Sequence, residues 1–355
     1  MQIMARHVRP GSGSFPGLLL MLIVAMTLQG CGRKPDQPGV LVEGQRLAVV
    51  DMHLHTGTWE GMTPRFHERL SERVPRGFRW VMPLVTPFTL NAKAILRELD
   101  NSGVSAGGVF ALYSPHSTGI ASNEFVAGEI ARDPQRLFGF ASLRVDRWNL
   151  DGPAQLAKLE ADLTGPGHFI GIKLAHGHQQ FRFDDERYYG IYAIAGRLHK
   201  PMYLHTGTSP NPGTRTEPPY ADPAYLEDAI RRYPAAIFIL GHTGYDSFAK
   251  ALTFTDSAIR LAKAYPNVYL EPGAMGAKRA DNVRLDFLKR VKVAGAIPKM
   301  IYGSDGPQVP GYVKSHLERF VAGMQESGYS VDEMRAILSG NFSQVFGLPP
   351  FTVEA

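Results

Sequence analysis

The sequence predicts an α/β fold, a TIM-like (β/α)8 barrel with an extra helix at its C-terminal end. Short apolar runs rich in β-branched or aromatic residues recur from residue 47 onward, and stretches of helical composition separate most of them. There are eight such runs, the number that closes a parallel barrel. A doubly wound open sheet would show the same alternation, but no glycine-rich phosphate loop follows the first run.

Predicted strands and helices alternate along the chain. The strands are Leu47–His53, Gly107–Leu112, Phe138–Leu143, Phe169–Leu174, Pro201–His205, Ala236–Gly241, Val268–Leu270 and Met300–Gly303. Helices are expected at about 89–102, 122–133, 154–163, 186–199, 223–233, 247–264, 280–294 and 311–326. Asp222 before Pro223 marks one helix start, and a capping box from Ser330 to Glu333 opens the extra C-terminal helix.

Composition excludes several classes of protein. The 355 residues are 44% hydrophobic and 20% charged, as in ordinary globular proteins, and they suffice for a large core. No basic run with interleaved aromatic residues is present, so we expect no nucleic-acid partner. No Gly-x-Ser-x-Gly elbow of a serine hydrolase occurs. Cys31 is the only cysteine, which excludes an intramolecular disulfide and a catalytic thiol elsewhere.

The first thirty residues are typical of an export signal. Basic residues precede an apolar run from Leu18 to Leu28, which is shorter than the about 20 residues that cross a bilayer. The run ends in Leu-Gln-Gly-Cys, which resembles the cleavage box of bacterial lipoproteins. We therefore expect a signal peptide over 1–30, lipid on Cys31, a tether over 31–46 and a domain over 47–355. An ordinary secretory signal is the alternative.

This interpretation predicts an exported protein, anchored by its lipid in the bacterial cell envelope. The glycine after Cys31 is compatible with the periplasmic side of the outer membrane. The membrane is then a partner through the N-terminal lipid alone. The sequence does not predict an oligomeric state.

The strongest chemical signal is the Asp-Met-His-Leu-His run at 51–55, at the end of the first predicted strand. Residues two apart on a strand face the same side, so His53 and His55 can both point inward and share one metal ion. By itself, a His-x-His pair is only a weak indication of a metal site.

Other candidate ligands end other predicted strands. His205 closes the fifth, His242 the sixth and Asp305 the eighth. Because the C-terminal ends of barrel strands converge on one mouth, these side chains are expected to lie near the first two histidines.

The same residues resemble the motifs of the amidohydrolase superfamily, in which Asp-x-His-x-His ends the first strand. Over roughly residues 47–350, the chain is similar to the amidohydrolase-related group that includes aminocarboxymuconate-semialdehyde decarboxylase. The motifs that carry this likeness are Gly171-Ile172-Lys173-Leu174, Leu204-His205-Thr206-Gly207, Gly241-His242-Thr243-Gly244, Gly303-Ser304-Asp305 and Gly340-Asn341-Phe342.

The resemblance implies that His53, His55, His205 and Asp305 hold one divalent metal ion, expected to be Zn²⁺. Such an ion lowers the pKa of a bound water from about 15.7 toward about 7. Asp305 would accept the proton of that water. His242 would be catalytic as well, by orienting the water or stabilising the oxyanion.

Lys173, at the end of the fourth predicted strand, has two interpretations. In related two-metal enzymes, a lysine at this position is carboxylated and bridges both ions. The alternative, which we favour, is that the ammonium of Lys173 pairs with a carboxylate in the mouth. Glu271, after the seventh strand, could contact the substrate, pair with Lys173 or cap the next helix. His176 and His178 follow Lys173 in a loop and are expected to be solvated.

Two long loops, 56–88 and 206–221, are candidates for substrate walls or a lid. The first contains two candidate substrate-binding residues, Trp59 and Arg65, and also Arg76. The predicted function is hydrolysis of an amide, ester or lactone of a small molecule by a metal-activated water. The alternative is metal-dependent decarboxylation of an unsaturated carboxylic acid, with Arg65 or Arg76 holding the carboxylate. A lipoprotein that binds a ligand without turnover is a third hypothesis.

Overall fold

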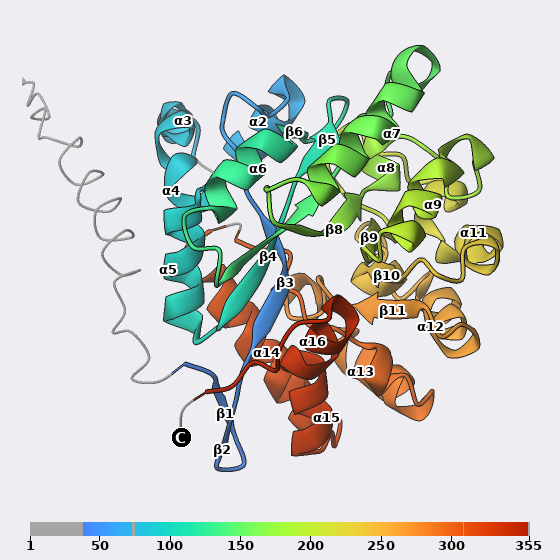
Figure 1. Cartoon of the computed structure of the whole chain (residues 1–355). Helices are drawn as coiled ribbons and strands as arrows, with labels where there is room; N and C mark the ends of the chain where they lie inside the picture. The colour runs from blue at the N-terminus through green and yellow to red at the C-terminus, as the bar shows by residue number, and fades with distance from the viewer. Residues whose placement is uncertain (1–37, 73–74, 308, 354–355) are drawn as a thin grey trace, which may run out of the picture.

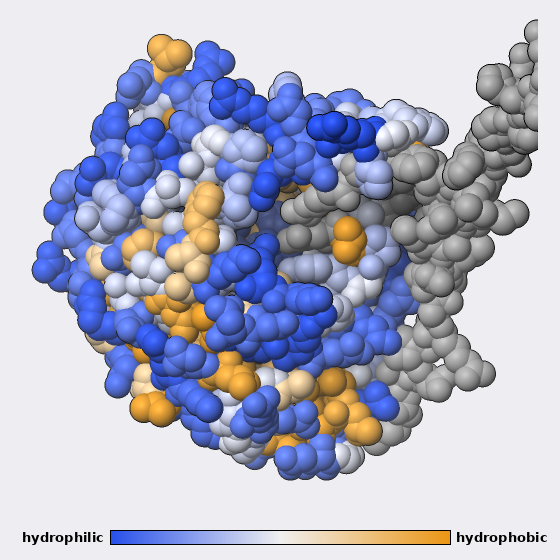
Figure 2. Space-filling view, turned by 180° about the vertical axis from the view of Figure 1, so that it is seen from behind, coloured by the Kyte–Doolittle hydropathy of each residue, from blue (hydrophilic) through white to orange (hydrophobic). Residues whose placement is uncertain are grey.

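The computed structural model describes residues 38–353, apart from 73–74 and 308. The predicted signal peptide, Cys31 and the first part of the tether lie outside these residues. Within the described part of the chain, no helix combines the length and the apolar character that a membrane span requires. Hydrophilic residues cover most of the face in Figure 2, with a few groups of hydrophobic side chains between them.

Seven parallel strands in sequence order curl into the predicted barrel (Figure 1). The α/β barrel expected from the sequence is therefore confirmed. The strands run in the order β11-β10-β9-β8-β7-β4-β3, so each pairs with the strand that follows it in the barrel. They are β3 (Val50–His55), β4 (Ala106–Phe110), β7 (Leu137–Ala141), β8 (Phe169–Leu174), β9 (Met202–His205), β10 (Phe238–Gly241) and β11 (Val268–Glu271).

The eighth predicted strand, Met300–Gly303, is not a regular strand. The segment nevertheless lies between β11 and β3: Ile301 N donates to Leu270 O at 2.9 Å, and Met52 N donates to Tyr302 O at 3.1 Å. Its pairing is limited to isolated bridges, and Tyr302 N donates to Ile337 O at 3.0 Å rather than to a neighbouring strand. The barrel is closed by a few bonds on each side of this segment.

Helices surround the barrel at all eight predicted positions. They are α5 (Ala92–Ser102), α6 (Asn123–Ile130), α7 (Trp148–Thr164), α9 (Tyr189–Arg197), α11 (Glu227–Arg232), α12 (Thr255–Ala264), α13 (Arg284–Val293) and α14 (Tyr312–Glu326). Both start signals operate as predicted: the Asp222 side chain accepts from Ala224 N, and Ser330 and Glu333 form a reciprocal capping box. The extra C-terminal helix is α15 (Val331–Arg335), continued by a π-helical turn η7 (Ala336–Gly340) and α16 (Asn341–Phe346).

The connections at the mouth contain short elements rather than plain loops. The predicted 56–88 loop holds α2 (Pro64–Ser71), η1 (Arg76–Val81), α3 (Met82–Val85) and the start of α4 (Pro87–Leu90). A small hairpin of β5 (Leu112–Ser114) and β6 (Gly119–Ala121) follows β4. The remaining short helices are α8 (His176–Gln179), α10 (Pro218–Ala221), η2 (Glu186–Tyr188), η3 (Pro223–Leu226), η4 (His242–Gly244), η5 (Lys278–Ala280) and η6 (Ile297–Lys299).

The end of the predicted tether is a β-hairpin. β1 (Val40–Val42) and β2 (Gln45–Leu47) pair antiparallel around two residues with φ of 47° and 80°, the left-handed values of a tight turn. Val42 and Leu47 are buried in the hydrophobic core. The chain from Val40 is therefore part of the folded domain rather than of a tether over 31–46, and the first barrel strand begins at Val50 instead of Leu47.

The hydrophobic core has two parts. The larger lies between the sheet and the surrounding helices, and the smaller fills the barrel interior with residues such as Met52, Phe110 and Tyr203. Phe342 from α16 belongs to the interior cluster and lies 4.5 Å, between ring centroids, from Phe346. The C-terminal helix therefore supplies apolar side chains to the barrel core.

We predict that Asn341 stabilises the closure of the barrel. Its buried Nδ2 donates to Met300 O at 2.7 Å and to Ile297 O at 3.2 Å. The substitution Asn341→Ala removes the bond to Met300, at the start of the eighth segment, and the bond to Ile297 just before it, and should lower the free energy of unfolding in urea by about 2–3 kcal/mol. Asn282→Ala is the matched control, because its amide bond to Lys250 O is exposed and should cost less than about 0.5 kcal/mol. Equal losses in both variants would contradict the prediction.

Candidate active site

Three ligand atoms converge at the barrel mouth. His53 Nε2 lies 3.2 Å from His55 Nε2 and 3.4 Å from Asp305 Oδ1, and His55 Nε2 lies 3.1 Å from the same oxygen. Two atoms that each bind a tetrahedral Zn²⁺ at about 2.0–2.1 Å are about 3.3–3.4 Å apart. The spacing of these atoms, here called the ligand trio, therefore fits a metal ion.

A β-bulge orients both histidines. The pairing of β3 with β4 shifts in register between Asp51 and Leu54. Both residues within the shift face the interior: Met52 packs in the barrel core, and the His53 ring lies 4.8 Å from that of Phe110 between centroids. Consecutive side chains of a regular strand point to opposite faces. The bulge lets the apolar Met52 and the candidate ligand His53 both point into the barrel.

Asp51 holds the two ends of the trio together. Its Oδ1 accepts from His53 N at 3.1 Å and from Ser304 N at 2.8 Å, which ties β3 to the residue before Asp305. Burial raises the pKa of this carboxyl to about 7, against the hydrogen bonds from Ser304 and His53. Asp51 is thus a structural partner of the trio.

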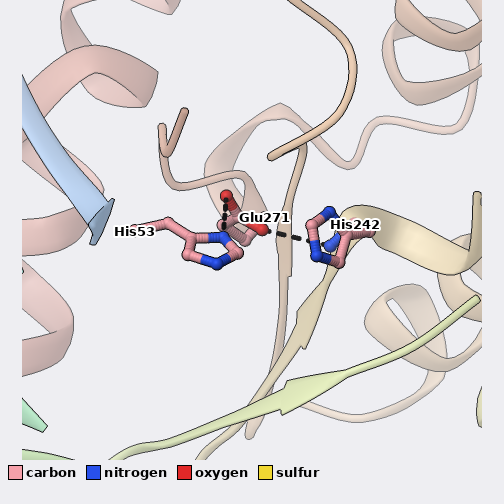
Figure 3. A group of neighbouring side chains, drawn as sticks. All are labelled: His53, His242 and Glu271. Carbon is pink, nitrogen blue, oxygen red and sulfur yellow. Dashed lines mark hydrogen bonds and ion pairs between the residues drawn. The ribbon is translucent and has the colours of Figure 1, made fainter. Parts of the chain in front are cut away.

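Glu271 accepts hydrogen bonds from groups around His53 (Figure 3). Its Oε1 lies 3.3 Å from His53 Nδ1, while Oε2 accepts from Tyr203 Oη at 3.1 Å and from His242 N at 3.0 Å. The carboxylate is fully buried, and burial raises its pKa. A Cβ on Gly303 would lie 2.2 Å from Oε1, so glycine makes room for it.

These contacts select one tautomer of His53. A proton on Nδ1 satisfies Glu271 and leaves the lone pair of Nε2 for the trio, as in carboxylate–histidine–metal arrangements. His53, His242 and Glu271 also offer atoms within 4.8 Å of one another. The trio is the better candidate for holding an ion, because the oxygens of Glu271 are already engaged by hydrogen-bond donors. The partners of Glu271 are His53, Tyr203 and the backbone of His242, so the expected pairing with Lys173 is not found among the described residues, and a contact with substrate stays a prediction.

His205 and His242 lie beside the trio. Their ring centroids are 4.4 Å apart, and the ring of His242 lies 5.1 Å from that of His53. His205 Nε2 is buried and has no hydrogen-bond partner among the described residues, as expected for a nitrogen that would bind an ion. It belongs to neither three-residue group of closely spaced ligand atoms, so its role as the fourth ligand stays a prediction.

The repeated His-Thr-Gly motif has a structural cause. Thr206 Oγ1 donates to Gly241 O at 2.7 Å, and Thr243 Oγ1 donates to Glu271 O at 2.9 Å. Each threonine therefore ties the end of its own strand to the end of the next strand. His242 itself has φ of 57°, a left-handed value that is held in place by these bonds.

Lys173 does not pair with a carboxylate, contrary to our expectation. Its ammonium lies 3.8 Å from the ring centroid of Tyr203 and 4.5 Å from that of Phe110, and it forms no ion pair among the described residues. Burial lowers its pKa to about 7, although the charges of Asp305 and Glu271 oppose this. The aromatic faces attract the cation without neutralising it.

Arg279 is a residue of the site that was not predicted from the sequence. This side chain follows β11, and its Nη2 donates to Asp305 Oδ2 at 3.2 Å, on the side away from the imidazoles. Burial raises the pKa of Asp305, but the hydrogen bond from His55 and the nearby imidazoles outweigh it and hold that pKa well below its usual range. Arg279 lies outside the motifs at the strand ends, so no sequence pattern pointed to it.

The other candidate side chains have different surroundings from those expected. Trp59 stacks on His67 with ring centroids 3.8 Å apart, so its ring has a local partner. Arg65 and Arg76 are exposed, on α2 and at the start of η1. His176 and His178 are buried, and the expectation of solvated loop histidines was wrong.

Comparison with known proteins identifies the family. A model of the family described as "Amidohydrolase" matches residues 50–348. The chain belongs to this family. The matched region includes the trio, His205, His242 and Lys173.

A curated protein and a solved TIM-barrel structure are also similar to this chain. The chain is 27% identical over 143 residues to protein fluG of Emericella nidulans, a match that covers 38% of this chain and 15% of that one. An uncharacterized TIM-barrel protein from Bordetella bronchiseptica has a TM-score of 0.65 at 18% identity, over 85% of this chain and 99% of that one.

Two other solved structures are named for an activity. One is a probable 2-pyrone-4,6-dicarboxylic acid hydrolase from Acinetobacter baumannii, with a TM-score of 0.58 and 15% identity over 85% of this chain and 100% of that one. The other is a dihydroxybenzoic acid decarboxylase from Polaromonas sp. JS666 with bound manganese, with a TM-score of 0.59 and 17% identity over 85% and 97%. At such identities the likeness is one of fold.

We predict that Glu271→Gln weakens metal binding by this amidohydrolase. The amide keeps the shape of the carboxylate but loses the charge that orients His53, so Zn²⁺ affinity should fall about 10–100-fold. Competition with a chromophoric chelator measures the dissociation constant. The exposed Glu318→Gln serves as the control. An unchanged affinity in Glu271→Gln would exclude the assigned orienting role.

Lys173 should make stability depend on pH. Its pKa is about 7 in the fold and 10.5 for a fully solvated lysine, so between these values the unfolded chain binds a proton that the folded chain does not. Stability from this group therefore rises with pH across that window. In metal-free wild type, the free energy of unfolding in urea should gain on the order of 2 kcal/mol from Lys173 between pH about 7.5 and 9.5. The Lys173→Met variant should lack this gain. Parallel pH profiles in variant and wild type would refute this.

Proposed function

We propose that this amidohydrolase is a metal-dependent hydrolase that cleaves an amide, ester or lactone of a small molecule. The convergence of His53 Nε2, His55 Nε2 and Asp305 Oδ1 within 3.4 Å carries the proposal. Each of the three atoms can offer a lone pair to the same divalent cation. His205 is the fourth ligand in this proposal, and Zn²⁺ is the expected ion.

The bound ion would supply a Lewis acid that polarises the substrate carbonyl and lowers the pKa of an attacking water. The Asp305 carboxylate, which the hydrogen bond from His55 and the nearby imidazoles keep ionised, would accept a proton from the attacking water, while Arg279 would hold its Oδ2. His242 would donate a hydrogen bond to the oxyanion as the carbonyl is attacked. Glu271 holds His53 in the required tautomer.

Decarboxylation of a carboxylic acid is the second candidate. Arg279 favours it, because a guanidinium beside the trio can bind a substrate carboxylate in the two-pronged manner that carboxylates prefer. It replaces Arg65 and Arg76 in that hypothesis. The decarboxylase with the similar fold supports the same possibility, and the hydrolase with the similar fold supports the first.

A substrate panel with two readouts tests the proposal. Zinc-loaded protein is incubated with aryl esters, lactones, amides and hydroxybenzoates, and acid formation and carbon dioxide release are followed separately. We expect acid formation without carbon dioxide, loss of activity on chelation and recovery when Zn²⁺ is restored. Carbon dioxide release alone would reverse the ranking of the two candidates.

Two ligand variants complete that test. His53→Ala and Asp305→Ala should each reduce bound metal by elemental analysis and lower kcat/KM at least about 1,000-fold, because ligand loss removes the electrostatic activation. Full metal content in both variants would place the ion elsewhere and overturn the assigned site.

A further inference from the structure

Two histidines that flank one glycine in α8 have opposite environments. The His176 ring packs 4.0 Å from Phe181 and 4.2 Å from Phe183, and its Nε2 lies 3.3 Å from Tyr192 Oη in the core. The His178 ring instead meets the edge of the His205 ring, with centroids 5.0 Å apart. One histidine of the pair is therefore part of the packing, and the other reaches the candidate active site.

Gly177 lets this loop approach the mouth closely. A Cβ there would lie 2.6 Å from Arg215 O, too close for any other residue without a shift of the backbone. The same two residues are joined by a hydrogen bond of 2.9 Å from Arg215 N to Gly177 O. The segment that carries His178 is therefore fixed against the long connection 206–221.

His178 is held by two hydroxyl groups from separate connections. Its Nδ1 lies 2.9 Å from Ser117 Oγ, between β5 and β6, and 3.3 Å from Thr214 Oγ1, in the connection 206–221. The two hydroxyls lie 3.0 Å from each other. Nδ1 thus has its partners, whereas Nε2 makes no hydrogen bond among the described residues.

This arrangement suits a substrate contact better than a purely structural tie. Hydroxyl groups rotate to donate or accept, so Ser117 and Thr214 can support either tautomer of a neutral imidazole. Nε2 can then act as a donor or an acceptor toward the mouth. The His178 side chain is only 5% exposed, yet its Nε2 is not among the buried atoms without a partner, so this nitrogen is accessible and a polar group of a ligand can replace water on it.

The topology sets His178 across the mouth from Asp305. β8, which precedes His178, has three strands on each side in the seven-stranded sheet, and the segment with Asp305 closes the gap between the two edges. A substrate that reaches the trio would therefore extend toward His178. The mechanism proposed above uses neither this histidine nor its two hydroxyls.

We propose that His178 is a substrate-binding residue that recognises a hydroxyl or carbonyl group of the substrate through Nε2. This proposal rests on the proposed function, because it takes the mouth as the substrate site. It adds that the substrate carries a second uncharged polar group beyond the bond that reacts at the metal.

Ring-substituted hydroxamates test this without knowledge of the substrate. Benzohydroxamate binds a metal ion through its hydroxamate, and its 2-, 3- and 4-hydroxy derivatives add one polar group at different distances. Calorimetric titration of zinc-loaded protein gives their dissociation constants. At least one hydroxy derivative should bind wild type about 5–10-fold more tightly than benzohydroxamate, the effect of one added hydrogen bond.

Variants assign that advantage to one nitrogen. It should disappear in His178→Leu, return in part in His178→Gln, whose amide can still hydrogen-bond, and persist in the matched control His176→Phe. Equal advantages in His178→Leu and wild type, or no advantage for any derivative in wild type, would overturn the proposal. Metal analysis separates the two failures, because protein that takes up no zinc would refute the proposed function and this inference together.

Discussion

The register shift in β3 is the constraint on which the site depends. It allows Met52 to fill the barrel core and His53, the next residue, to face the same interior at the mouth. The buried Asp51 carboxylate stabilises this local departure by accepting from His53 N and Ser304 N. Two strand ends that are far apart in sequence are thereby joined by one side chain, and the trio forms between them.

A second layer of hydrogen bonds gives the trio its orientation. Glu271 collects bonds from Tyr203 and from the backbone of His242 while facing His53. A fully buried carboxylate is costly unless donors surround it, so this one is stable only where these elements meet. The orientation of the His53 ring therefore depends on the buried Glu271 carboxylate, and the carboxylate in turn depends on His53 as one of its hydrogen-bond donors.

The charges around the mouth are unevenly balanced. Asp305 is shared between the imidazoles and Arg279, while Lys173 rests on aromatic faces without a carboxylate partner among the described residues. A cation with a lowered pKa that sits so near the trio changes its charge close to neutral pH. The protonation state of the site is consequently coupled to any ion or anionic group that enters it.

Much of this architecture was predictable, because hydrophobic periodicity and helix-start signals are local. Seven of the eight strand runs and all eight helix positions follow from such patterns, and the eighth run failed because pairing across the closing gap depends on two distant edges. The hairpin at Val40 was missed for a related reason. Its short apolar alternation is ambiguous until Val42 and Leu47 find a core to enter.

The sequence by itself determined the residue types of the site, since His53, His55, His205, His242 and Asp305 each end a strand or barrel segment, and the ends of parallel strands meet. Only the tertiary structure decided the second partners: Glu271 behind His53, Arg279 on Asp305, aromatic rings under Lys173 and hydroxyls on His178. These contacts join residues from different connections. Their geometry depends on how the loops pack, which no spacing along the chain encodes.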